Sequence, residues 1–576
     1  MVKISKKDKM INKFFEKLKN ELLLRNLDGY IVPKNDKFFS EYAYPNRLKT
    51  ISNFSGSAGF AIILKKKNYL FVDGRYTTQA KIESGNKYNI FEIPKFFPFD
   101  IFKNYKKKIK IGFDPNLFTN LTLKRYFKET CNLLPVRDNL IDKIYNKKEI
   151  TKKTNFYFLN YKITGESLNS KILRLTKFLK KKNIDNIFIS APENVAWLLN
   201  LRGKDNPNSP IPNSNVIVTK KGKIFMFSDL DKIKKIKSYK KIIYNDFNNF
   251  FPVVSKISGK NFSIDNLTCS ISKQNLISSR FKIINYIDPC YKFKSIKNKI
   301  EIRNMEEAHI SDGVALTKFL FWLKNSKLKL LNEINVERKL ENLRKKNKKY
   351  LFPSFGTIAG SGPNGAIIHY RANQTTKRII KKSDLLLCDS GGQYKHGTTD
   401  VTRTVCFKKP KKKIRDIFTR VLKGHIAVAT TNLNKINKGY QIDKKARYWL
   451  NEIGLDYGHG TGHGVGFFLN VHEGPQSISK FNNVKLKEGM ILSNEPGYYK
   501  ENQFGIRIEN LVYVKKIKKK LLFKNLTYAP IDIDLIDFSI LSKKEKNYLF
   551  KYHMETYLNL SKYLNHKEKK WLQKLI

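Results

Sequence analysis

The segment Gly458–Gly466 constrains this chain more than any other, because five of its nine residues are glycines and two others, His459 and His463, are histidines. Glycine loses more backbone entropy on ordering than any other residue, so a segment this rich in it makes a poor helix or strand interior. It suits a loop where the backbone must approach a bound group closely. We therefore predict a loop here that directs two imidazoles at such a group.

A pair of aspartates lies upstream of this loop. Asp389 ends the apolar run Leu385–Cys388, and Asp400 heads the run Val401–Val405 after a predicted turn at Ser390–Gly392. Because side chains alternate along a strand with a period of two, such a hairpin can bring both carboxylates to one end and onto one face. Carboxylates beside apolar strands are costly unless a positive charge compensates them.

A pair of glutamates repeats the pattern downstream. Glu495 follows the strand-like run Met490–Ser493, and Glu509 lies in the middle of the predicted strand Gly505–Val512. A glutamate inside an apolar strand also needs a partner. Two hairpin-like units therefore each deliver two carboxylates, and the glycine-rich loop adds an imidazole.

This donor set is dominated by oxygen and includes one nitrogen, which favours Mn²⁺, Fe²⁺, Co²⁺ or Zn²⁺ over a purely soft-metal site. Carboxylates can bridge two ions about 3.5–4 Å apart, and a hydroxide shared at that spacing can attack while both ions stabilise developing negative charge. We predict a site for two divalent metal ions. Its candidate ligands are the carboxylates of Asp389, Asp400, Glu495 and Glu509 and an imidazole of the glycine-rich segment.

Each carboxylate also has an ordinary structural explanation. Asp389 alone fits a turn cap, which is a common role of aspartate. Asp400 fits an ion pair with the nearby Arg403. Glu509 fits an ion pair with Arg507. The metal hypothesis rests on the combination of the two pairs with the histidine loop, which chance rarely makes.

The first half of the chain repeats one order of elements. An amphipathic helix, a strand and a hairpin with a lysine turn are predicted twice, over residues 11–27, 27–33 and 61–73 and again over 171–181, 184–189 and 216–229. This order predicts a duplicated α/β domain. We place its boundary in the lysine-rich link at residues 145–163.

The second half is predicted to be mostly strands with a few helices. One or two helices over Ile300–Leu323 lead into a strand-rich part from Asp384 to Val514. Helices are expected over Ile414–Leu433 and Tyr440–Ile453 within that part. The tail Ser542–Ile576 alternates charged and aromatic residues at helical spacing, so we expect a helix docked on the body or on a partner subunit.

The net charge of +63 is extreme and by itself indicates nucleic acid or an anionic surface as partner. The lysines, however, are spread along the chain in short runs such as Lys65–Lys67 and Lys518–Lys520, without a single basic module. Abundant Lys, Asn, Ile, Phe and Tyr with sparse Ala and Gly are typical of an AT-rich genome. We therefore predict no specific nucleic-acid partner.

The cysteines and the apolar runs indicate the compartment. The five cysteines are odd in number and show no CxxC spacing, as expected for reduced thiols of a cytosolic protein. The basic N-terminus continues into Ile11–Lys17 without an apolar core, which argues against a signal peptide. No apolar run approaches the roughly 18 residues that a membrane span needs. We expect a cytoplasmic protein without a membrane partner.

Five motifs of the chain resemble those of the pita-bread metallopeptidases. The resemblance is closest to the three-domain cytosolic Xaa-Pro aminopeptidases, the aminopeptidase P family. The motifs are Asp389–Thr404 (DSGGQYKHGTTDVTRT), His459–Gly466 (HGTGHGVG), Asn470–Pro475 (NVHEGP), Asn494–Tyr499 (NEPGYY) and Gly505–Asn510 (GIRIEN).

The front half carries the same resemblance. Residues 53–59 and 73–76 resemble the N-terminal creatinase-like domain of that family, and residues 193–203 resemble its second domain. The implied fold class is α/β (α+β), with two creatinase-like N-terminal domains followed by a C-terminal pita-bread catalytic domain with a helical tail. The expected domains are residues 1–163, 164–294 and 295–576.

The resemblance also implies roles for residues of the site. Asp389, Asp400, His463, Glu495 and Glu509 would hold two divalent ions, most often Mn²⁺ in this family. His369, His459 and His472 would line the site, stabilise the tetrahedral intermediate and manage protons near the scissile amide. Glu495 would also act as general base towards the bridging water. Arg507 would orient a ligand carboxylate.

These histidines have ordinary alternatives too. His369 fits a buried core residue, His459 fits a loop histidine, and His472 fits a pair with Glu473. His396 lies between the two aspartates, where the family more usually has an acidic residue. We expect His396 to cover the hairpin rather than to sit at the metals.

The implied activity is hydrolysis of the bond between an N-terminal residue and a following proline by a hydroxide that bridges two metal ions. Proline nitrogen carries no hydrogen in a peptide, so a dedicated pocket for such substrates is expected. Related enzymes are commonly homodimers, and Arg75 is a candidate for the substrate end of the site. One alternative is a prolidase, which cleaves Xaa-Pro dipeptides and usually has one front domain. Another is a non-enzymatic peptide or histone binder, a class that loses metal ligands.

Overall fold

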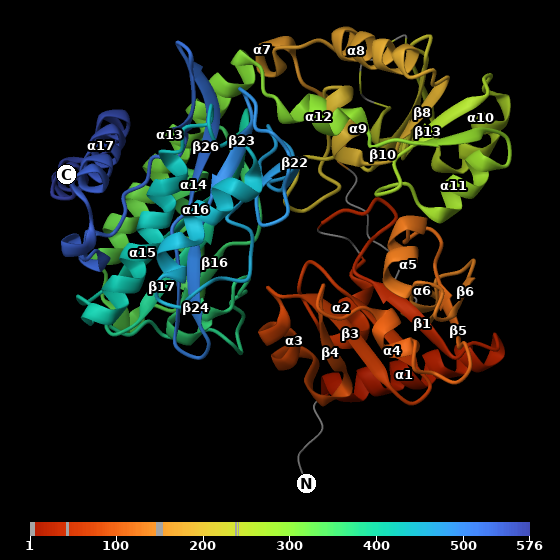
Figure 1. Cartoon of the computed structure of the whole chain (residues 1–576), viewed down its shortest axis with the longest axis horizontal. Helices are drawn as coiled ribbons and strands as arrows, with labels where there is room; N and C mark the ends of the chain where they lie inside the picture. The colour runs from red at the N-terminus through yellow and green to blue at the C-terminus, as the bar shows by residue number, and fades with distance from the viewer. Residues whose placement is uncertain (1–5, 42–44, 146–153, 235, 237–238, 240) are drawn as a thin grey trace. The chain divides into compact units, whose positions relative to one another are not determined.

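The computed structural model of the chain describes residues 6–41, 45–145, 154–234, 236, 239 and 241–576, with the backbone alone for residues 6–12 (Figure 1). The chain divides into two units. Unit 1 comprises residues 1–158, 167–207 and 211–290, and unit 2 comprises residues 159–166, 208–210 and 291–576.

Unit 1 contains two α/β halves. The elements of the first half are α1 (Lys6–Leu24), β1 (Gly29–Pro33), α2 (Arg47–Ser52), β2 (Phe60–Leu64), β3 (Asn68–Asp73), α3 (Thr77–Ser84), β4 (Asn89–Ile93), α4 (Pro98–Phe102), β5 (Lys110–Phe113), α5 (Asn120–Phe127), β6 (Asn132–Pro135) and α6 (Leu140–Tyr145). Those of the second half are β7 (Tyr157–Phe158), α8 (Leu168–Lys181), β8 (Asn186–Ile189), α9 (Pro192–Leu198), β9 (Leu201–Arg202), β10 (Ser214–Thr219), β11 (Ile224–Ser228), β12 (Ile242–Asn245), α10 (Phe250–Lys256), β13 (Asn261–Ile264), α11 (Ile271–Ser278) and β14 (Lys282–Asn285).

The two halves have the same sheet topology. The six strands of the first sheet lie in the order β4-β3-β2-β1-β5-β6, and those of the second in the order β12-β11-β10-β8-β13-β14. In both sheets the central hairpin strands pair antiparallel and the outer strands pair parallel. This agreement confirms the duplication predicted from the sequence.

Alternation along β1 explains why its sheet is covered on both faces. Tyr30 and Val32 pack with Leu18 and Leu22 of α1 in one core. Ile31, between them, packs in the core on the opposite face, as the two-residue period of a strand requires. The amphipathic helix predicted at the start of the chain therefore covers one side of the sheet.

Unit 2 contains α7 (Tyr161–Thr164), residues 208–210 and the chain from Tyr291 onward, which includes most of α12 (Pro289–Ser295). Its further helices are α13 (Lys299–Lys324), α14 (Glu333–Lys345), α15 (Lys412–Ala429), α16 (Gly439–Asn451), α17 (Lys543–Leu560) and α18 (His566–Gln573). Its strands are β15 (Tyr350–Pro353), β16 (Ile358–Ser361), β17 (Leu385–Ser390), β18 (Gly392–Tyr394), β19 (Gly397–Thr398), β20 (Val401–Cys406), β21 (Gly462–Gly464), β22 (Glu473–Ile478), β23 (Ile491–Asn494), β24 (Gly497–Lys500), β25 (Phe504–Arg507), β26 (Asn510–Ile517) and β27 (Lys520–Asn525).

Two strand pairs of unit 2 are built alike. β17 and β20 are antiparallel neighbours, although the chain forms the short hairpin β18–β19 between them. β23 and β26 are likewise antiparallel neighbours, with the hairpin β24–β25 between them in the sequence. Each long pair belongs to a different sheet, with the orders β16-β17-β20 and β22-β21-β23-β26-β27.

The sequence pattern predicted one or two helices at the start of unit 2 and one helix in the tail, and the structure differs in the tail. The region from Ile300 to Leu323 forms the single helix α13, which begins at a capping box made by Asn298 and Glu301. The tail forms two helices, α17 and α18, where one was predicted, because the chain turns at Ser561–Tyr563 between them. Leu560 and Leu572 of these helices pack with Tyr528 and with α13, so the tail is docked on unit 2 itself.

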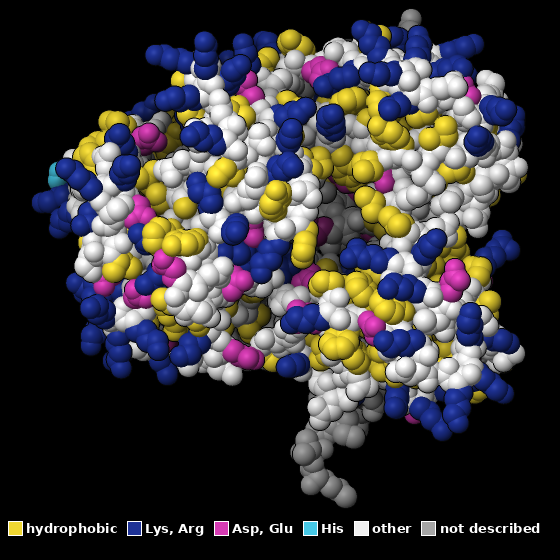
Figure 2. Space-filling view, viewed as in Figure 1, with side chains coloured by type: hydrophobic (Ala, Val, Ile, Leu, Met, Phe, Trp, Pro, Cys, Tyr) yellow, Lys and Arg dark blue, Asp and Glu magenta, His cyan; other side chains and the backbone are white. Residues whose placement is uncertain are grey.

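Other predicted properties of the chain concern its surface and its thiols. All five cysteines are buried and carry free thiols. Among the described residues, no helix combines the length and apolar character that crossing a membrane requires. Figure 2 shows lysine and arginine side chains spread over the visible face and not gathered in one patch.

Candidate metal centre

The strand pair β17–β20 holds the two aspartates. Asp389 pairs with Thr402 in the antiparallel ladder, and Asp400 directly precedes β20, so both carboxylates lie at the same end. The chain does not return at Ser390–Gly392 as predicted. It first forms the β18–β19 hairpin, because Gly392 and Gln393 pair with β15 instead of closing a turn.

The strand pair β23–β26 holds the two glutamates. Asn494 pairs with Asn510 across the ladder, so Glu495 and Glu509, just outside this pair, also lie at one end. The prediction that Glu509 sits in the middle of a strand is wrong. Glu509 lies between β25 and β26, where the chain passes from one sheet to another, and its backbone N–H donates to the carbonyl of Thr402 at 3.2 Å.

His463 lies on a short strand and not on a loop, which corrects the prediction for the glycine-rich segment. A Cβ on Gly462 would lie 2.0 Å from the Ser493 carbonyl oxygen, and one on Gly464 would lie 2.3 Å from that of Glu473. Only glycine therefore lets β21 fit between β22 and β23. The glycines serve close packing of backbone against backbone, and they place His463 at the edge of the site.

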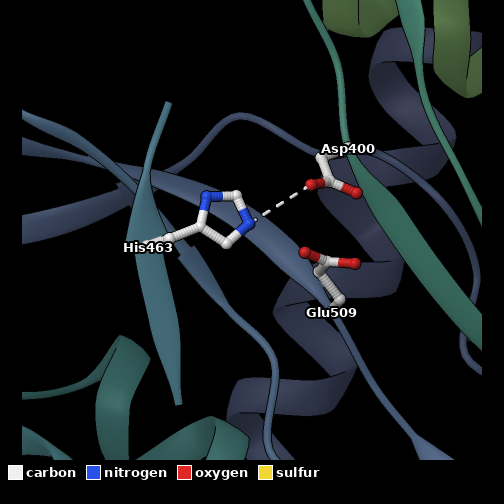
Figure 3. A group of neighbouring side chains, drawn as sticks. All are labelled: Asp400, His463 and Glu509. Carbon is white, nitrogen blue, oxygen red and sulfur yellow. Dashed lines mark ion pairs between the residues drawn. The ribbon is translucent and has the colours of Figure 1, made fainter. Parts of the chain in front are cut away.

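The His463 ring is oriented by its backbone. Its Nδ1–H donates to the carbonyl of Gly464 at 2.9 Å, which leaves the lone pair of Nε2 free to bind a cation. Nε2 lies 3.4 Å from Oδ2 of Asp400 and 3.6 Å from Oε1 of Glu495. Asp400, His463 and Glu509 each place a ligand atom within 4.8 Å of the others, and all three side chains point at one another (Figure 3).

The carboxylates repel one another strongly. Burial, and then the charges of Asp389 and Glu495, raise the pKa of Asp400 well above its usual value. Burial, and then the charges of Asp400, Glu495 and Asp389, raise the pKa of Glu509 well above its usual value. The buried Oδ1 of Asp389 has no hydrogen-bond partner. An orphaned acceptor among clustered buried carboxylates fits a site for cations, since positive charge there removes the repulsion.

Arg507 partly compensates this charge. Its Nη2 donates to Oδ2 of Asp389 at 2.6 Å, and not to Glu509, so the alternative ion pair with Glu509 is wrong. Thr402 completes the support, since its hydroxyl donates to Oε2 of Glu509 at 2.7 Å and accepts from Nε of Arg507 at 3.1 Å. Arg403, the alternative partner of Asp400, instead donates to backbone carbonyls, among them that of Glu509 at 2.6 Å.

Tyr499 links Arg507 to a histidine, which the sequence did not predict. Its hydroxyl accepts from Nη1 of Arg507 at 2.5 Å and donates to Nε2 of His459 at 2.9 Å, because Nδ1–H of His459 donates to the carbonyl of Gly460. Burial raises the pKa of Tyr499 to about 12. The only sequence signal for this role is the place of Tyr499 at the end of the motif that begins at Asn494.

The remaining histidines occupy different environments. His472 is exposed, and its ring centre lies 4.3 Å from that of His463 in an edge-on arrangement. Its neighbour Glu473 pairs with Lys294, so the alternative of a His472–Glu473 pair is not supported. His369 is half-buried in a turn beside Tyr370, which packs in one cluster with Tyr499.

The two remaining candidates are His396 and Arg75. His396 is buried next to Glu307, with its Nε2 3.6 Å from that carboxylate, and burial together with Lys349 lowers its pKa to about 4. It thus sits beside α13, in the turn between β18 and β19. Arg75 belongs to unit 1, where it pairs with Asp73 at 2.6 Å.

Comparison with known proteins shows which family models and relatives the chain matches. Residues 303–516 match metallopeptidase family M24, residues 519–576 match the C-terminal region of peptidase M24, and residues 15–144 and 147–301 match creatinase/prolidase N-terminal domains. A probable Xaa-Pro aminopeptidase P of Laccaria bicolor is 36% identical over 580 residues, which cover 95% of this chain and 90% of that protein.

Two solved structures are similar as well. An X-prolyl aminopeptidase of Caenorhabditis elegans, described as a cytosolic enzyme with a di-nuclear active site, matches with a TM-score of 0.88 and 30% identity over 95% of each chain. A prolidase of Pyrococcus horikoshii matches with a TM-score of 0.52 and 25% identity, and covers 63% of this chain and 99% of its own. The chain belongs to metallopeptidase family M24, with creatinase-like domains before its catalytic domain.

Proposed function

We propose that this protein is a metal-dependent aminopeptidase that hydrolyses the N-terminal Xaa-Pro bond of peptides. The observation that carries the proposal is the convergence of Asp400, His463 and Glu509 on one spot, in a chain that is similar over 95% of its length to a probable Xaa-Pro aminopeptidase P and to an X-prolyl aminopeptidase. A non-enzymatic peptide binder is disfavoured, since all five expected ligand residues are present.

The site fits two divalent ions, which we propose to be Mn²⁺. The proposed ligands are Asp389, Asp400, His463, Glu495 and Glu509. When bound, the two ions supply a water-derived nucleophile at neutral pH and polarise the scissile carbonyl. The C. elegans relative is described as having a di-nuclear active site, which supports two ions here.

The protein's own residues orient these ligands and handle protons. Arg507 fixes one oxygen of Asp389 and leaves Oδ1 for a cation, while Thr402 fixes one oxygen of Glu509. Ser493 donates to Oε1 of Glu495 at 3.0 Å, and we propose that Glu495 also acts as the general base.

We propose that His369, His459 and His472 line the substrate site. His459 is locked by Tyr499 and by its own backbone contact, so its orientation is set before substrate arrives. His472 is exposed beside His463, which suits a group that meets an incoming peptide. His369 carries the weakest geometric support of the three.

Further proposals concern the domains, the assembly and the location of the protein. The duplicated front half distinguishes this chain from the prolidase of P. horikoshii, which covers 63% of it. We propose three domains over residues 1–163, 164–294 and 295–576. We also propose a homodimer in the cytoplasm, in line with the cytosolic C. elegans enzyme, with peptides whose second residue is proline as its partners.

The decisive experiment strips the protein of metal, restores Mn²⁺, and assays the peptides Arg-Pro-Pro and Gly-Pro. Release of arginine from the tripeptide, with little cleavage of the dipeptide, is expected. Turnover confined to Gly-Pro would instead identify a prolidase. No turnover of either peptide, with Mn²⁺ bound, would contradict a peptidase function.

A further inference from the structure

A buried triad of charges lies next to the metal centre. The carboxylate of Glu473 accepts hydrogen bonds from the ammonium group of Lys294, at 3.1 Å, and from that of Lys297. All three side chains are at most 2% exposed. Gln476 also approaches the carboxylate, with its amide nitrogen 3.5 Å from Oε1. None of these residues belongs to the proposed metal ligands.

The composition of the triad is unfavourable for stability alone. Two ammonium groups share the Glu473 carboxylate, with Glu301 as a further negative charge acting on Lys297, and burying so many charges is costly. Burial lowers the pKa of Lys297. A single lysine would balance the charge of Glu473 at a lower desolvation cost. The second lysine therefore calls for another explanation.

The triad joins the start of unit 2 to the strands of the site. Lys294 lies in the last turn of α12, and Lys297 follows in a segment whose Ile296 bridges to Met490 beside β23. Glu473 is the first residue of β22 and stands opposite Gly464, the neighbour of His463. The segment at residues 294–297 is thus tied to the strand pair that carries the imidazole.

The glycine-rich segment makes room for this carboxylate. A Cβ on Gly466 would lie 3.3 Å from Oε2 of Glu473, and a Cβ on Gly464 would clash with the amide of Gln476 at 2.3 Å. Glu473 also directly follows His472, whose ring lies against His463. A shift of Glu473 would therefore move one histidine through the chain and the other through the β21–β22 ladder.

We propose that Glu473, held by Lys294 and Lys297, is a positioning residue that sets the orientation of His472 and His463 at the metal centre. This inference rests on the proposed function for its kinetic part. Its metal-binding part can be tested whether or not the protein cleaves peptides.

The test compares three variants with the wild type. Lys297→Met removes the extra charge and keeps the Lys294–Glu473 pair, so it is expected to fold. Glu473→Gln keeps the shape of the side chain and removes its charge. Glu545→Gln is the control, because it breaks another largely buried pair, with Lys423, at 2.7 Å between α15 and α17.

The melting temperature of each variant is measured first, and two further properties are then measured. Metal-free protein is titrated with Co²⁺ and its visible absorption is followed, and kcat and KM are measured with Arg-Pro-Pro after Mn²⁺ loading. For Lys297→Met and Glu473→Gln we expect Co²⁺ affinity or kcat to fall by about 10- to 100-fold, as for other groups that orient metal ligands. KM is expected to stay within about twofold, and Glu545→Gln is expected to lose melting temperature only.

The outcomes separate the two proposals. If Lys297→Met has the same Co²⁺ spectrum, Co²⁺ affinity and kcat as the wild type, the positioning role is overturned, even if Glu473→Gln fails to fold. A wild-type protein that binds Co²⁺ but cleaves no Xaa-Pro bond would overturn the proposed function. In that case an altered Co²⁺ spectrum in Lys297→Met would still support the triad.

Discussion

At the scale of single residues, the centre is a balance of buried charges. Four carboxylates lie close together, and Arg507 is the cation that reaches them, through Asp389. Tyr499, Asp389 and Glu495 together outweigh burial and raise the pKa of Arg507 well above its usual value, so it stays charged. One arginine cannot neutralise four carboxylates, which is why the site is suited to divalent cations.

Replacing Tyr499 by Phe tests the link between Arg507 and His459. The variant removes one hydroxyl that accepts from Arg507 and donates to His459. We expect kcat to fall by about 10- to 100-fold while the metal content stays the same, because the ligands themselves remain. Tyr498→Phe is the matched control, since Tyr498 packs in the hydrophobic cluster with Ile506. Equal kcat for both variants would exclude a role of the Tyr499 hydroxyl.

The raised pKa values of Asp400 and Glu509 predict how pH affects the metal-free protein. A carboxyl whose pKa is raised by folding binds its proton more tightly in the folded chain than in the unfolded chain. Its contribution to stability is therefore complete below the unfolded value of about 4 and is lost as pH rises through the folded value.

Glu509→Gln removes one of these titrations. In the presence of a chelator, its free energy of unfolding relative to wild type is expected to increase as pH rises above the unfolded value of about 4, by at most about 1.4 kcal/mol per pH unit. Urea unfolding at several pH values measures this difference. A difference that is constant or that falls with pH would contradict the assigned direction.

At the scale of elements, the site depends on two strand pairs that end at the same place. β17–β20 and β23–β26 each carry two carboxylates at one end, and each is interrupted by a short hairpin in the sequence. These interruptions let the carboxylates of one pair lie 11 to 14 residues apart along the chain while their strands remain neighbours. Close packing of the inserted hairpins then fixes the geometry.

Gly505 of β25 illustrates this packing. A Cβ there would lie 1.8 Å from the carbonyl oxygen of Gly365, a backbone atom that cannot move aside alone. Gly505→Ala is expected to destabilise the protein by about 1–3 kcal/mol and to displace Arg507, two residues later. Gly458→Ala is the control, because nothing lies within 4 Å of its Cβ position. Similar melting temperatures for the two variants would show that β25 adapts freely.

The tail helix α17 is expected to stabilise the strands of the site. The buried hydroxyl of Tyr552 accepts from Nη2 of Arg403 and donates to the carbonyl of Ala529, both at 2.8 Å. Tyr552→Phe leaves a buried guanidinium donor with one partner fewer, so we expect a loss of about 1–3 kcal/mol in urea unfolding. Tyr563→Phe, at an exposed ring, is expected to change little. If Tyr552→Phe leaves the free energy of unfolding unchanged, the tail does not unfold cooperatively with the strands of the site.

At the scale of the whole molecule, the net charge of +63 is the most unusual property. Lysine and arginine side chains are spread over the visible surface in Figure 2, and no basic module stands out in the sequence. A diffuse charge binds polyanions through counterion release alone, without preference for sequence.

Any binding to DNA is therefore expected to be weak and incidental. Fluorescence anisotropy with two unrelated labelled duplexes should give equal affinities that fall by about 10³-fold or more between about 50 mM and about 200 mM salt. A sequence preference, or binding that persists at the higher salt, would reveal a nucleic-acid function that the sequence did not predict.

Much of the fold could be predicted from the sequence because its signals are local. Alternation around Ile31 and helical spacing from Phe14 to Leu22 reflect the geometry of single elements. The glycine-rich segment was one exception, since a strand forms at Gly462–Gly464. Its glycines are needed because the backbones of Ser493 and Glu473, on neighbouring strands, lie too close for a Cβ. Rules based on neighbouring residues in the sequence do not include such contacts.

The sequence by itself determined the order of elements, the duplicated front half and the residue types gathered for the centre. Only the tertiary structure decided which partner each charge has. Arg507 pairs with Asp389, 118 residues away, and not with Glu509, two residues away, and Glu473 binds a lysine 179 residues upstream and not His472. The physical reason is that periodicity and turn chemistry act over a few residues, whereas the packing of strands from different sheets selects the ion pairs of a buried site.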